Sequence, residues 1–156
     1  MDTGGAGEKA AGVRDAAELP PVLSGWFAGK GWRPRRHQLE MLAAARRGRN
    51  ALLVAPTGAG KTLAGFLASI VELIESPTDG LHTLYVSPLK ALAVDVQRNL
   101  LTPVAEMGLP IRVETRTGDT PAERKARQRV RPPQMLLTTP ESLSLLLSHE
   151  DAALLF

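Results

Sequence analysis

The turn APTGAGKT, from Ala55 to Thr62, constrains this chain more than any other stretch of its sequence. The four apolar residues ALLV at 51–54 precede it and predict a short buried strand, and the apolar repeat from Leu63 to Glu75 predicts a helix. A glycine-rich turn between a strand and a helix makes a cradle for phosphate, because backbone N–H groups and the helix N-terminus converge there. The sequence therefore predicts a phosphate-binding turn.

The residue types within this turn each suit the binding of a nucleotide. Glycines at 58 and 60 permit backbone dihedrals that a Cβ would penalise. The lysine at 61 can reach β- and γ-phosphates, and the threonine hydroxyl at 62 can bind Mg²⁺. The phosphate-loop pattern expects glycine in place of alanine at 55, and the alternative is a glycine-rich turn with an incidental lysine. The predicted set is Ala55, Pro56, Thr57, Gly58, Ala59, Gly60, Lys61 and Thr62, with Lys61 and Thr62 as the catalytic pair.

The region before the turn predicts a leader and two helices. Residues 1–17 contain almost no large apolar side chain and predict a disordered leader. Residues 18–50 predict a helix that starts at Pro20–Pro21 and a second that Pro34 opens, with Gly48 as its C-terminal cap.

The region after the turn predicts an alternation of strands and helices. Strands are expected at 82–87, 111–115 and 134–138, and helices at 89–101, at 121–129 and from Pro140 onward. Pro103 and the residues 108–110 are expected to bracket a loop or a short helix after the first of these helices, and a Glu123–Arg127 pair is expected on the second. Residues 149–156 are expected to begin a further element. Strands separated by helices indicate an α/β fold with a parallel sheet and helices on both faces.

Composition adds little about function. The net charge of +3 weakly favours an anionic partner, although the genome's base composition explains an arginine excess equally well. The chain has no cysteine, which excludes disulfides and fits the cytoplasm, and no apolar run long enough to span a membrane. The three histidines are scattered without metal-ligand spacing, so a surface role is expected for each.

Five segments in order resemble the first motor domain of superfamily 2 helicases: GWRPRRHQLEML, ALLVAPTGAGKTLAGFL, GLHTLYVSPLKALAVDVQRNL, PIRVETRTGDTPAERK and LLTTPESLSLLLS. More closely, they resemble the large helicase-related group and, within it, the ligase-associated DEXH-box DNA helicases of bacteria. Alanine at 55 is common in that superfamily. The resemblance implies an incomplete RecA-like phosphate-loop domain at 51–156, preceded by a helical adenine-recognition region, the Q-motif, at 18–50.

The resemblance also implies roles in binding ATP, residue by residue. Gln38 corresponds to the glutamine that reads adenine, since an amide both donates and accepts hydrogen bonds. Arg35 either packs near the base or is a solvated charge at a helix start. Trp32 either shapes the same pocket or packs in the core, and packing is the favoured alternative.

A second set of implied roles concerns a nucleic-acid strand. Lys90 resembles the basic residue of the first DNA-contacting motif, or it is an exposed lysine without a role. The other implied positions, whose alternative is ordinary turn and cap chemistry, are Pro88, Arg116, Thr117, Gly118 and Thr139. Asp119 and Glu141 are expected to act as N-cap and first-turn residues. The arginines at 124, 127, 129 and 131 are expected to form a solvated helix face rather than a nucleic-acid patch.

The DEXH box of that family does not occur in these 156 residues, which suggests a fragment truncated before it. The resemblance implies a parent protein that hydrolyses ATP to move along single-stranded or partly duplex DNA in repair, and a cytoplasmic location is expected from the absence of cysteine. A DNA ligase or another repair protein is an implied partner. The fragment alone is expected to be inactive. The alternatives are an RNA helicase of the same superfamily and a catalytically inactive nucleotide-binding module.

Overall fold

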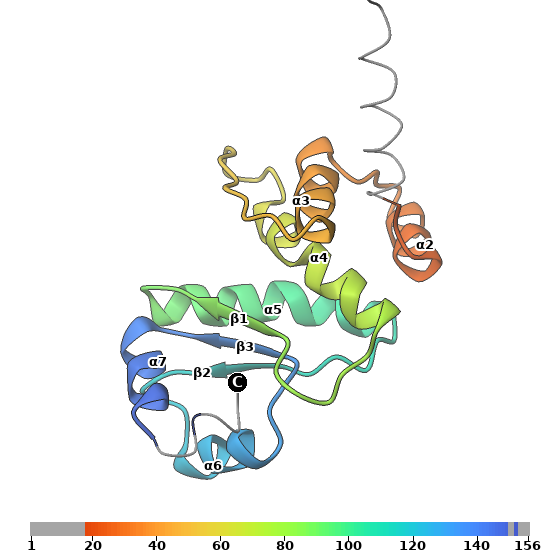
Figure 1. The fold of residues 1–156 in the computed structure, drawn as a ribbon. Coiled ribbons are helices and arrows are strands. Elements are labelled where there is room, and N and C mark those ends of the chain that lie inside the picture. Colours follow the sequence, from red (N-terminus) through yellow and green to blue (C-terminus); the bar gives the residue numbers. More distant parts are fainter. Residues whose placement is uncertain (1–17, 150–151, 153–156) are drawn as a thin grey trace, which may run out of the picture. The chain divides into compact units, whose positions relative to one another are not determined.

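The computed structural model describes residues 18–149 and 152, so the leader expected at 1–17 and most of the element expected at 149–156 lie outside the described part. The chain divides into two compact units, residues 1–75 and 76–156, and each is described by itself (Figure 1). Among the described residues, no helix combines the length and apolar character needed to cross a lipid bilayer.

The described part of the first unit, residues 18–75, contains three helices, and each of them was predicted from the sequence. They are α2 (Pro21–Gly29), α3 (Arg36–Arg46) and α4 (Lys61–Glu75). Proline stands in the first turn of α2, where its missing N–H has no helical partner to lose. Gly48 follows α3 with a φ of 62°, the left-handed conformation typical of a helix C-terminus, so its predicted capping position is confirmed.

The core of this unit lies largely between α3 and α4, which pack against each other. On α4, Leu67, Ile70 and Val71 are completely buried, at the three- and four-residue spacing of one helix face. On α3, Leu42 is completely buried as well. An ion pair of 2.6 Å between Arg46 and Glu75 joins the C-terminal ends of the two helices.

The buried strand predicted at 51–54 is wrong for this structure. These residues have no regular secondary structure, and Leu52 and Val54 are 89% and 86% exposed to solvent. An apolar run predicts that burial would be favourable, but a strand exists only where a neighbouring strand pairs with it. That partner is not encoded in the four residues themselves.

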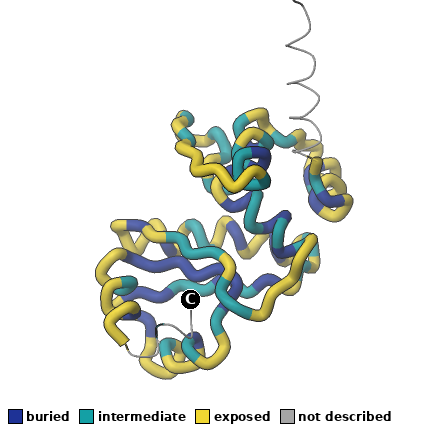
Figure 2. The backbone as a smooth tube through the Cα atoms, viewed as in Figure 1, coloured by how far each residue is buried: buried dark blue, intermediate teal, exposed yellow. Residues whose placement is uncertain are grey.

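The second unit contains a parallel sheet of three strands, β1 (Thr83–Val86), β2 (Val113–Arg116) and β3 (Met135–Thr138). Their order is β1-β3-β2, so β3 is central, and all four of its residues are buried (Figure 2). At mid-strand, Leu136 is in register with Leu84 on one side and with Glu114 on the other. The predicted parallel sheet is thereby confirmed.

Helices cover both faces of this sheet, as predicted. They are α5 (Lys90–Glu106), α6 (Ala122–Val130) and α7 (Pro140–Leu147). Figure 1 shows α5, which packs against β2 and β3, on the opposite side of the sheet from α6. Leu136 and Glu114 share one face because they are register partners. Leu146 of α7 packs against Leu136, and Arg127 of α6 binds Glu114, so α6 and α7 share that face.

The predicted end of this helix at residue 101, with a separate loop or short helix after Pro103, is wrong, because α5 continues through Pro103 to Glu106. A proline inside a helix lacks one N–H, and its ring crowds the preceding turn. Here Leu100, Pro103 and Val104 are all buried on one face of α5. The burial of this apolar face favours the continued helix against the local preference of proline.

Polar side chains, rather than an apolar face, attach α6 to the sheet. Arg127 pairs with Glu114 of β2 at 3.0 Å instead of with the predicted Glu123. Gln128 is completely buried and donates to a Glu114 carboxylate oxygen at 2.9 Å and to the Thr115 carbonyl at 3.1 Å. A carboxylate on the adjacent strand competes well for Arg127, because an exposed pair within one helix contributes only a few tenths of a kcal/mol, about 0.2–0.5.

Replacement of Gln128 should therefore destabilise the second unit. We expect Gln128→Ala to lower the free energy of unfolding by about 1–3 kcal/mol, because it leaves buried hydrogen-bonding groups without partners. Denaturant unfolding of the full protein followed by circular dichroism measures this change. The control is Arg124→Ala on the exposed side of the same helix, for which a change within about 0.5 kcal/mol is expected. Equal stability of the two variants would contradict the role given to the buried network.

Candidate functional site

The turn at 55–62 has the backbone conformation that its glycines predict. Gly58 and Gly60 have φ values of 78° and 72°, in the left-handed region that disfavours other residues. A Cβ at Gly60 would lie 2.8 Å from the side-chain nitrogen of Gln38, so the Gln38 side chain would have to shift to make room for it. Gly60 therefore fits its position both by its dihedral angles and by its lack of a side chain.

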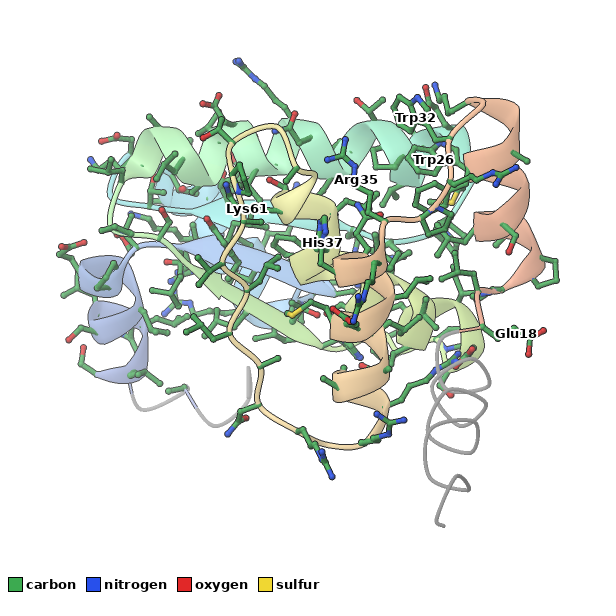
Figure 3. All side chains as sticks on the ribbon, turned by 90° about the horizontal axis from the view of Figure 1, so that it is seen from above. Glu18, Trp26, Trp32, Arg35, His37 and Lys61 are labelled. Atoms are coloured by element: carbon green, nitrogen blue, oxygen red, sulfur yellow. The ribbon has the colours of Figure 1, made fainter. Side chains whose placement is uncertain are left out.

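The start of α3 holds this turn through three successive carbonyl groups. Arg35 donates from Nη1 to the Gly58 carbonyl at 3.1 Å. His37 Nε2 lies 2.8 Å from the Ala59 carbonyl oxygen, and Gln38 Nε2 donates to the Gly60 carbonyl at 3.4 Å. Figure 3 shows Arg35 and His37 beside the turn that carries Lys61. We call Arg35, His37 and Gln38 the loop clamp.

By binding the carbonyl oxygens of the turn, the loop clamp also determines where the N–H groups of the same peptide units point. In a trans peptide the carbonyl and the following N–H point in opposite directions. With the Ala59 and Gly60 carbonyls directed at the clamp, the N–H groups of Gly60 and Lys61 point away from it. Within the part of the chain that the structure describes, no acceptor binds the N–H groups of Gly60, Lys61 or Thr62. These donors lie at the N-terminus of α4, where an anion is favourable.

Lys61 places its ammonium group over the same turn. Its Nζ donates to the carbonyl oxygens of Ala55 at 2.7 Å and Pro56 at 2.9 Å, and the residue is exposed. Thr62 follows in the first turn of α4 and is partly buried. The cation, the N–H donors and the hydroxyl fit the phosphates of a nucleotide, and a threonine oxygen is a ligand type that Mg²⁺ accepts.

Gln38 is buried and already engaged within the protein. Gln38 is 4% exposed. Its Oε1 accepts a hydrogen bond from the Arg35 backbone N–H at 2.8 Å, and its Nε2 donates to the Gly60 carbonyl oxygen. An amide has two N–H donors and two acceptor lone pairs, so one of each is left over for a base. Gln38 is therefore part of the support for the turn, whatever base it contacts.

Trp32 lies beside Trp26 rather than alone. Their rings meet edge to face with centroids 5.8 Å apart, and the Trp32 residue is 57% exposed (Figure 3). The Trp32 backbone N–H donates to the Phe27 carbonyl at 2.9 Å, which anchors the segment after α2. The core position favoured from the sequence is therefore wrong, because Trp32 contacts Trp26 at the surface of this unit.

His37 is the member of the loop clamp that sequence reasoning missed. A carbonyl oxygen can only accept, so the contact with Ala59 requires a proton on His37 Nε2. The available signal is its place in PRRHQ, between two residues that were singled out for the nucleotide site. No spacing rule in the sequence pairs a histidine at a helix start with a carbonyl about twenty residues later.

In the second unit, most of the residues expected to contact nucleic acid lie directly after one of the three β-strands. Pro88 and Lys90 follow β1, Thr117 and Gly118 follow β2, and Thr139 follows β3. Since the carboxyl ends of parallel strands meet at one edge of a sheet, these positions lie at a common edge. We call it the strand-exit edge.

Lys90 reaches across this edge. Its Nζ lies 3.0 Å from both carboxylate oxygens of Asp119, in the turn after β2. A Cβ built at Gly118 would lie 3.4 Å from the same Nζ, so the lysine side chain passes over the glycine. Because β1 and β2 are the two outer strands, this ion pair joins the segments that leave opposite sides of β3.

The threonines at this edge also perform the turn and cap chemistry named as their alternative. The Thr117 backbone N–H donates to the Thr120 hydroxyl at 2.9 Å. Thr139 is the N-cap of α7, and its hydroxyl oxygen accepts from the Ser142 backbone N–H at 3.4 Å. Glu141 lies in the first turn of that helix as expected, and its pKa is lowered by its own backbone N–H, by the Thr139 hydroxyl and by the charge of Lys90.

Arg116 is directed away from the strand-exit edge. The residue is 5% exposed, and its Nη1 donates to the Lys125 carbonyl at 2.9 Å and to Gln128 Oε1 at 3.4 Å. Burial lowers the pKa of its guanidinium, and the charge of Arg129 lowers it further. The side chain alternates with Thr115 and therefore faces α6, so it serves as an internal tie in this structure instead of an exposed phosphate contact.

Comparison with known proteins identifies the family. The DEAD/DEAH box helicase family matches residues 35–155. The Lhr helicase/probable uracil glycosylase of Mycolicibacterium smegmatis is 48% identical over 136 residues, which are 79% of this chain and 9% of that protein. The ATP-dependent helicase Lhr-Core of Methanothermobacter thermautotrophicus is 40% identical over 143 residues, which are 83% of this chain and 17% of that protein.

Solved structures give the same answer. The Mycobacterium smegmatis helicase Lhr bound to ssDNA and AMP-PNP matches with a TM-score of 0.76 at 43% identity, over 85% of this chain and 18% of that one. The DUF1998 helicase MrfA bound to DNA and AMPPNP matches with a TM-score of 0.78 at 26% identity, over 88% of this chain and 19% of that one. The family match spans most of the sequence, and the chain belongs to the DEAD/DEAH box helicase family.

Proposed function

We propose that this chain provides the ATP-binding turn and part of the strand-binding surface of an ATP-dependent DNA helicase. The observation that carries the proposal is the phosphate turn, which the loop clamp holds with its N–H donors and Lys61 at the start of α4. The chain spans less than a fifth of the Lhr relatives described above, so the activity of a whole protein is part of the proposal.

In the proposed site, the turn from Ala55 to Thr62 holds the phosphates of ATP. Lys61 and the N–H groups of the first turn of α4 supply positive charge, and the Thr62 hydroxyl is a ligand for Mg²⁺. Hydrolysis of the bound ATP, in which the γ-phosphoryl group is transferred to water, would release the free energy for movement along the nucleic-acid strand. Gln38 uses its remaining donor and acceptor to read adenine, and Arg35 holds the Gly58 carbonyl beside it.

At the proposed strand-binding surface, a nucleic-acid backbone lies along the strand-exit edge. Lys90 contributes a cation to a phosphate, and Pro88, Thr117, Gly118 and Thr139 shape the edge. Arg116 supports it from inside through α6. We favour DNA because the Lhr and MrfA structures are titled as complexes with DNA, although backbone contacts alone suit RNA as well.

The narrower parts of the proposal rest on the sequence resemblance. They assign residues 18–50 to adenine recognition and residues 51–156 to the first motor domain. They also place the parent protein in cytoplasmic DNA repair, in the ligase-associated group, with a DNA ligase or another repair protein as partner. The name of the Mycolicibacterium relative, which couples a helicase with a probable uracil glycosylase, supports a repair setting.

Lys61 is the cation that the proposed site places at the phosphates of ATP. In the full-length protein, Lys61→Ala should reduce strand-stimulated ATP hydrolysis by on the order of 10²-fold or more, because a preorganised cation at the phosphates is lost. The control is Arg49→Ala, which removes an exposed cation of the same unit. Turnover by Lys61→Ala near the rate of the control would contradict the assignment. ATP binding without turnover in the unmutated protein would support the nucleotide-binding module instead.

Substitutions of Gln38 and His37 distinguish recognition of the adenine base from support of the phosphate turn. Gln38→Ala should lower the ratio of kcat/KM for ATP to that for GTP, because the base loses its hydrogen-bonding partner. His37→Ala removes the contact with the Ala59 carbonyl and no base contact, so both nucleotides should lose kcat/KM by the same factor. An ATP/GTP ratio unchanged by Gln38→Ala would show that Gln38 supports the turn only.

The proposed contact between Lys90 and a nucleic-acid phosphate can be tested by substitution. Lys90→Ala should weaken single-strand binding and reduce the slope of log K against log salt by about 0.7, the value for one phosphate contact on a single strand. Arg98→Ala, on the exposed side of the same helix, is the control. Fluorescence anisotropy with DNA and RNA oligonucleotides of one sequence measures both quantities and the preference between them. An affinity and slope equal to those of the control would assign Lys90 to the solvated surface.

A further inference from the structure

The carboxylate that accepts hydrogen bonds from the Lys90 ammonium group has the right chemistry to imitate phosphate. Asp119 presents two oxygens at 3.0 Å each, and a phosphodiester presents two non-bridging oxygens to a cation in the same way. The pair lies in the open, with 53% of the Lys90 side chain and 79% of the Asp119 side chain exposed. A strand that approaches Lys90 therefore meets Asp119 at the same place.

We propose that Asp119 competes with the nucleic-acid backbone for Lys90 and so lowers the affinity of the strand-exit edge. The inference rests on the proposed strand contact of Lys90 and adds a regulator to it. When no strand is present, the carboxylate neutralises the lysine. When a strand binds, the phosphate replaces the carboxylate, and Asp119 is released to solvent.

The exchange is energetically easy because the ion pair is exposed. Two solvated charges in contact stabilise each other only weakly, and salt weakens them further. The pair can therefore open whenever a phosphate offers Lys90 an equivalent contact. A buried pair could not do this, since opening it would leave an uncompensated charge away from water.

Hydrogen bonds that do not involve the Asp119 carboxylate close the turn in which it lies. The turn after β2 is closed by the Thr117 N–H to the Thr120 hydroxyl at 2.9 Å and by the Thr120 N–H to the Thr117 carbonyl at 3.2 Å. The N-cap of α6 is Pro121, with no side-chain cap bond, so the capping role expected for Asp119 is wrong. The interaction that the structure gives this carboxylate is with Lys90.

Other charged groups lie beside the pair of Lys90 and Asp119. Lys125 donates from Nζ to the Gly118 carbonyl at 3.2 Å, which places a second cation beside the same turn. The charge of Lys90 also lowers the pKa of Glu141, so a second carboxylate contributes to the charge balance at this edge. A phosphate at this edge meets two cations and two carboxylates, and the removal of one carboxylate shifts that balance toward binding.

The opposite role for Asp119 is that it holds Lys90 in the orientation that phosphate requires. Competition predicts that loss of the carboxylate tightens binding, whereas positioning predicts that the same loss weakens it. The sign of one measured change therefore decides between the two roles. Because the first depends on screening, its size must also shrink as salt rises.

The experiment compares carboxylate-to-amide variants of the full-length protein. Asp119→Asn keeps the shape of the side chain and removes the charge, and Asp119→Ala is a second variant that tests the same loss. The matched control is Asp95→Asn, the same charge change on the exposed part of α5. Binding to a fluorescent single-stranded oligonucleotide is measured by anisotropy from low to high salt, and circular dichroism verifies that each variant folds.

We expect Asp119→Asn to bind the oligonucleotide roughly two- to five-fold more tightly than the unmutated protein at low salt, the range that an exposed ion pair allows. The gain should fade at high salt and exceed that of Asp95→Asn. In a Lys90→Ala background, Asp119→Asn should have no more effect than the control.

Weaker binding by Asp119→Asn, or a gain equal to that of Asp95→Asn, would overturn the proposal while the strand contact of Lys90 stands. If Lys90→Ala alone leaves binding unchanged, the strand contact fails and the competition fails with it. These results are distinguishable because the first set leaves the effect of Lys90→Ala in place and the second removes it.

Discussion

The candidate site of the first unit depends on the hydrogen bonds that the carbonyl oxygens of the phosphate turn accept from the loop clamp. Each peptide group is polar on both sides, and the two sides of a trans peptide point in opposite directions. Donors from the loop clamp engage the carbonyls of Gly58, Ala59 and Gly60, which leaves the N–H groups on the other side for an anion. The phosphate-binding character of the turn is therefore a product of the start of α3 as much as of its glycines.

The second unit shows the same dependence on polar groups at a different place. Its central strand is wholly apolar in its first three residues and buried, but α6 carries few apolar side chains and is held by Glu114, Gln128 and Arg116 instead. Such a network is stabilising only when all of its groups are satisfied. Arg116 is drawn into it by alternation along β2, and the basic character of its sequence position gives no indication of this.

Much of the fold could be predicted from the sequence because its signals are local. Helical periodicity, the proline at the start of α2 and the glycine cap at Gly48 depend on neighbouring residues, and so do the strand patterns of β1, β2 and β3. The failures concern partners that lie far along the chain. Residues 51–54 lack a paired neighbour, Pro103 is buried in a helix face, and Arg127 finds Glu114 rather than Glu123. His37 and Asp119 were missed as contacts for the same reason, since each meets its partner some twenty to thirty residues away.

The strand order β1-β3-β2 has a consequence for how the second unit acquires its structure. Thr83 and Val113 both pair with Met135, so the two outer strands have no hydrogen-bonded neighbour in this sheet until the central strand joins them. The chain emerges from the ribosome with β1 and β2 first and β3 last. Sheet formation must therefore wait for the late strand, and its closing contacts are distant in sequence, which slows folding. Until then the apolar residues of β1 are open to other chains, and a nascent or newly released polypeptide is most prone to aggregate in that interval.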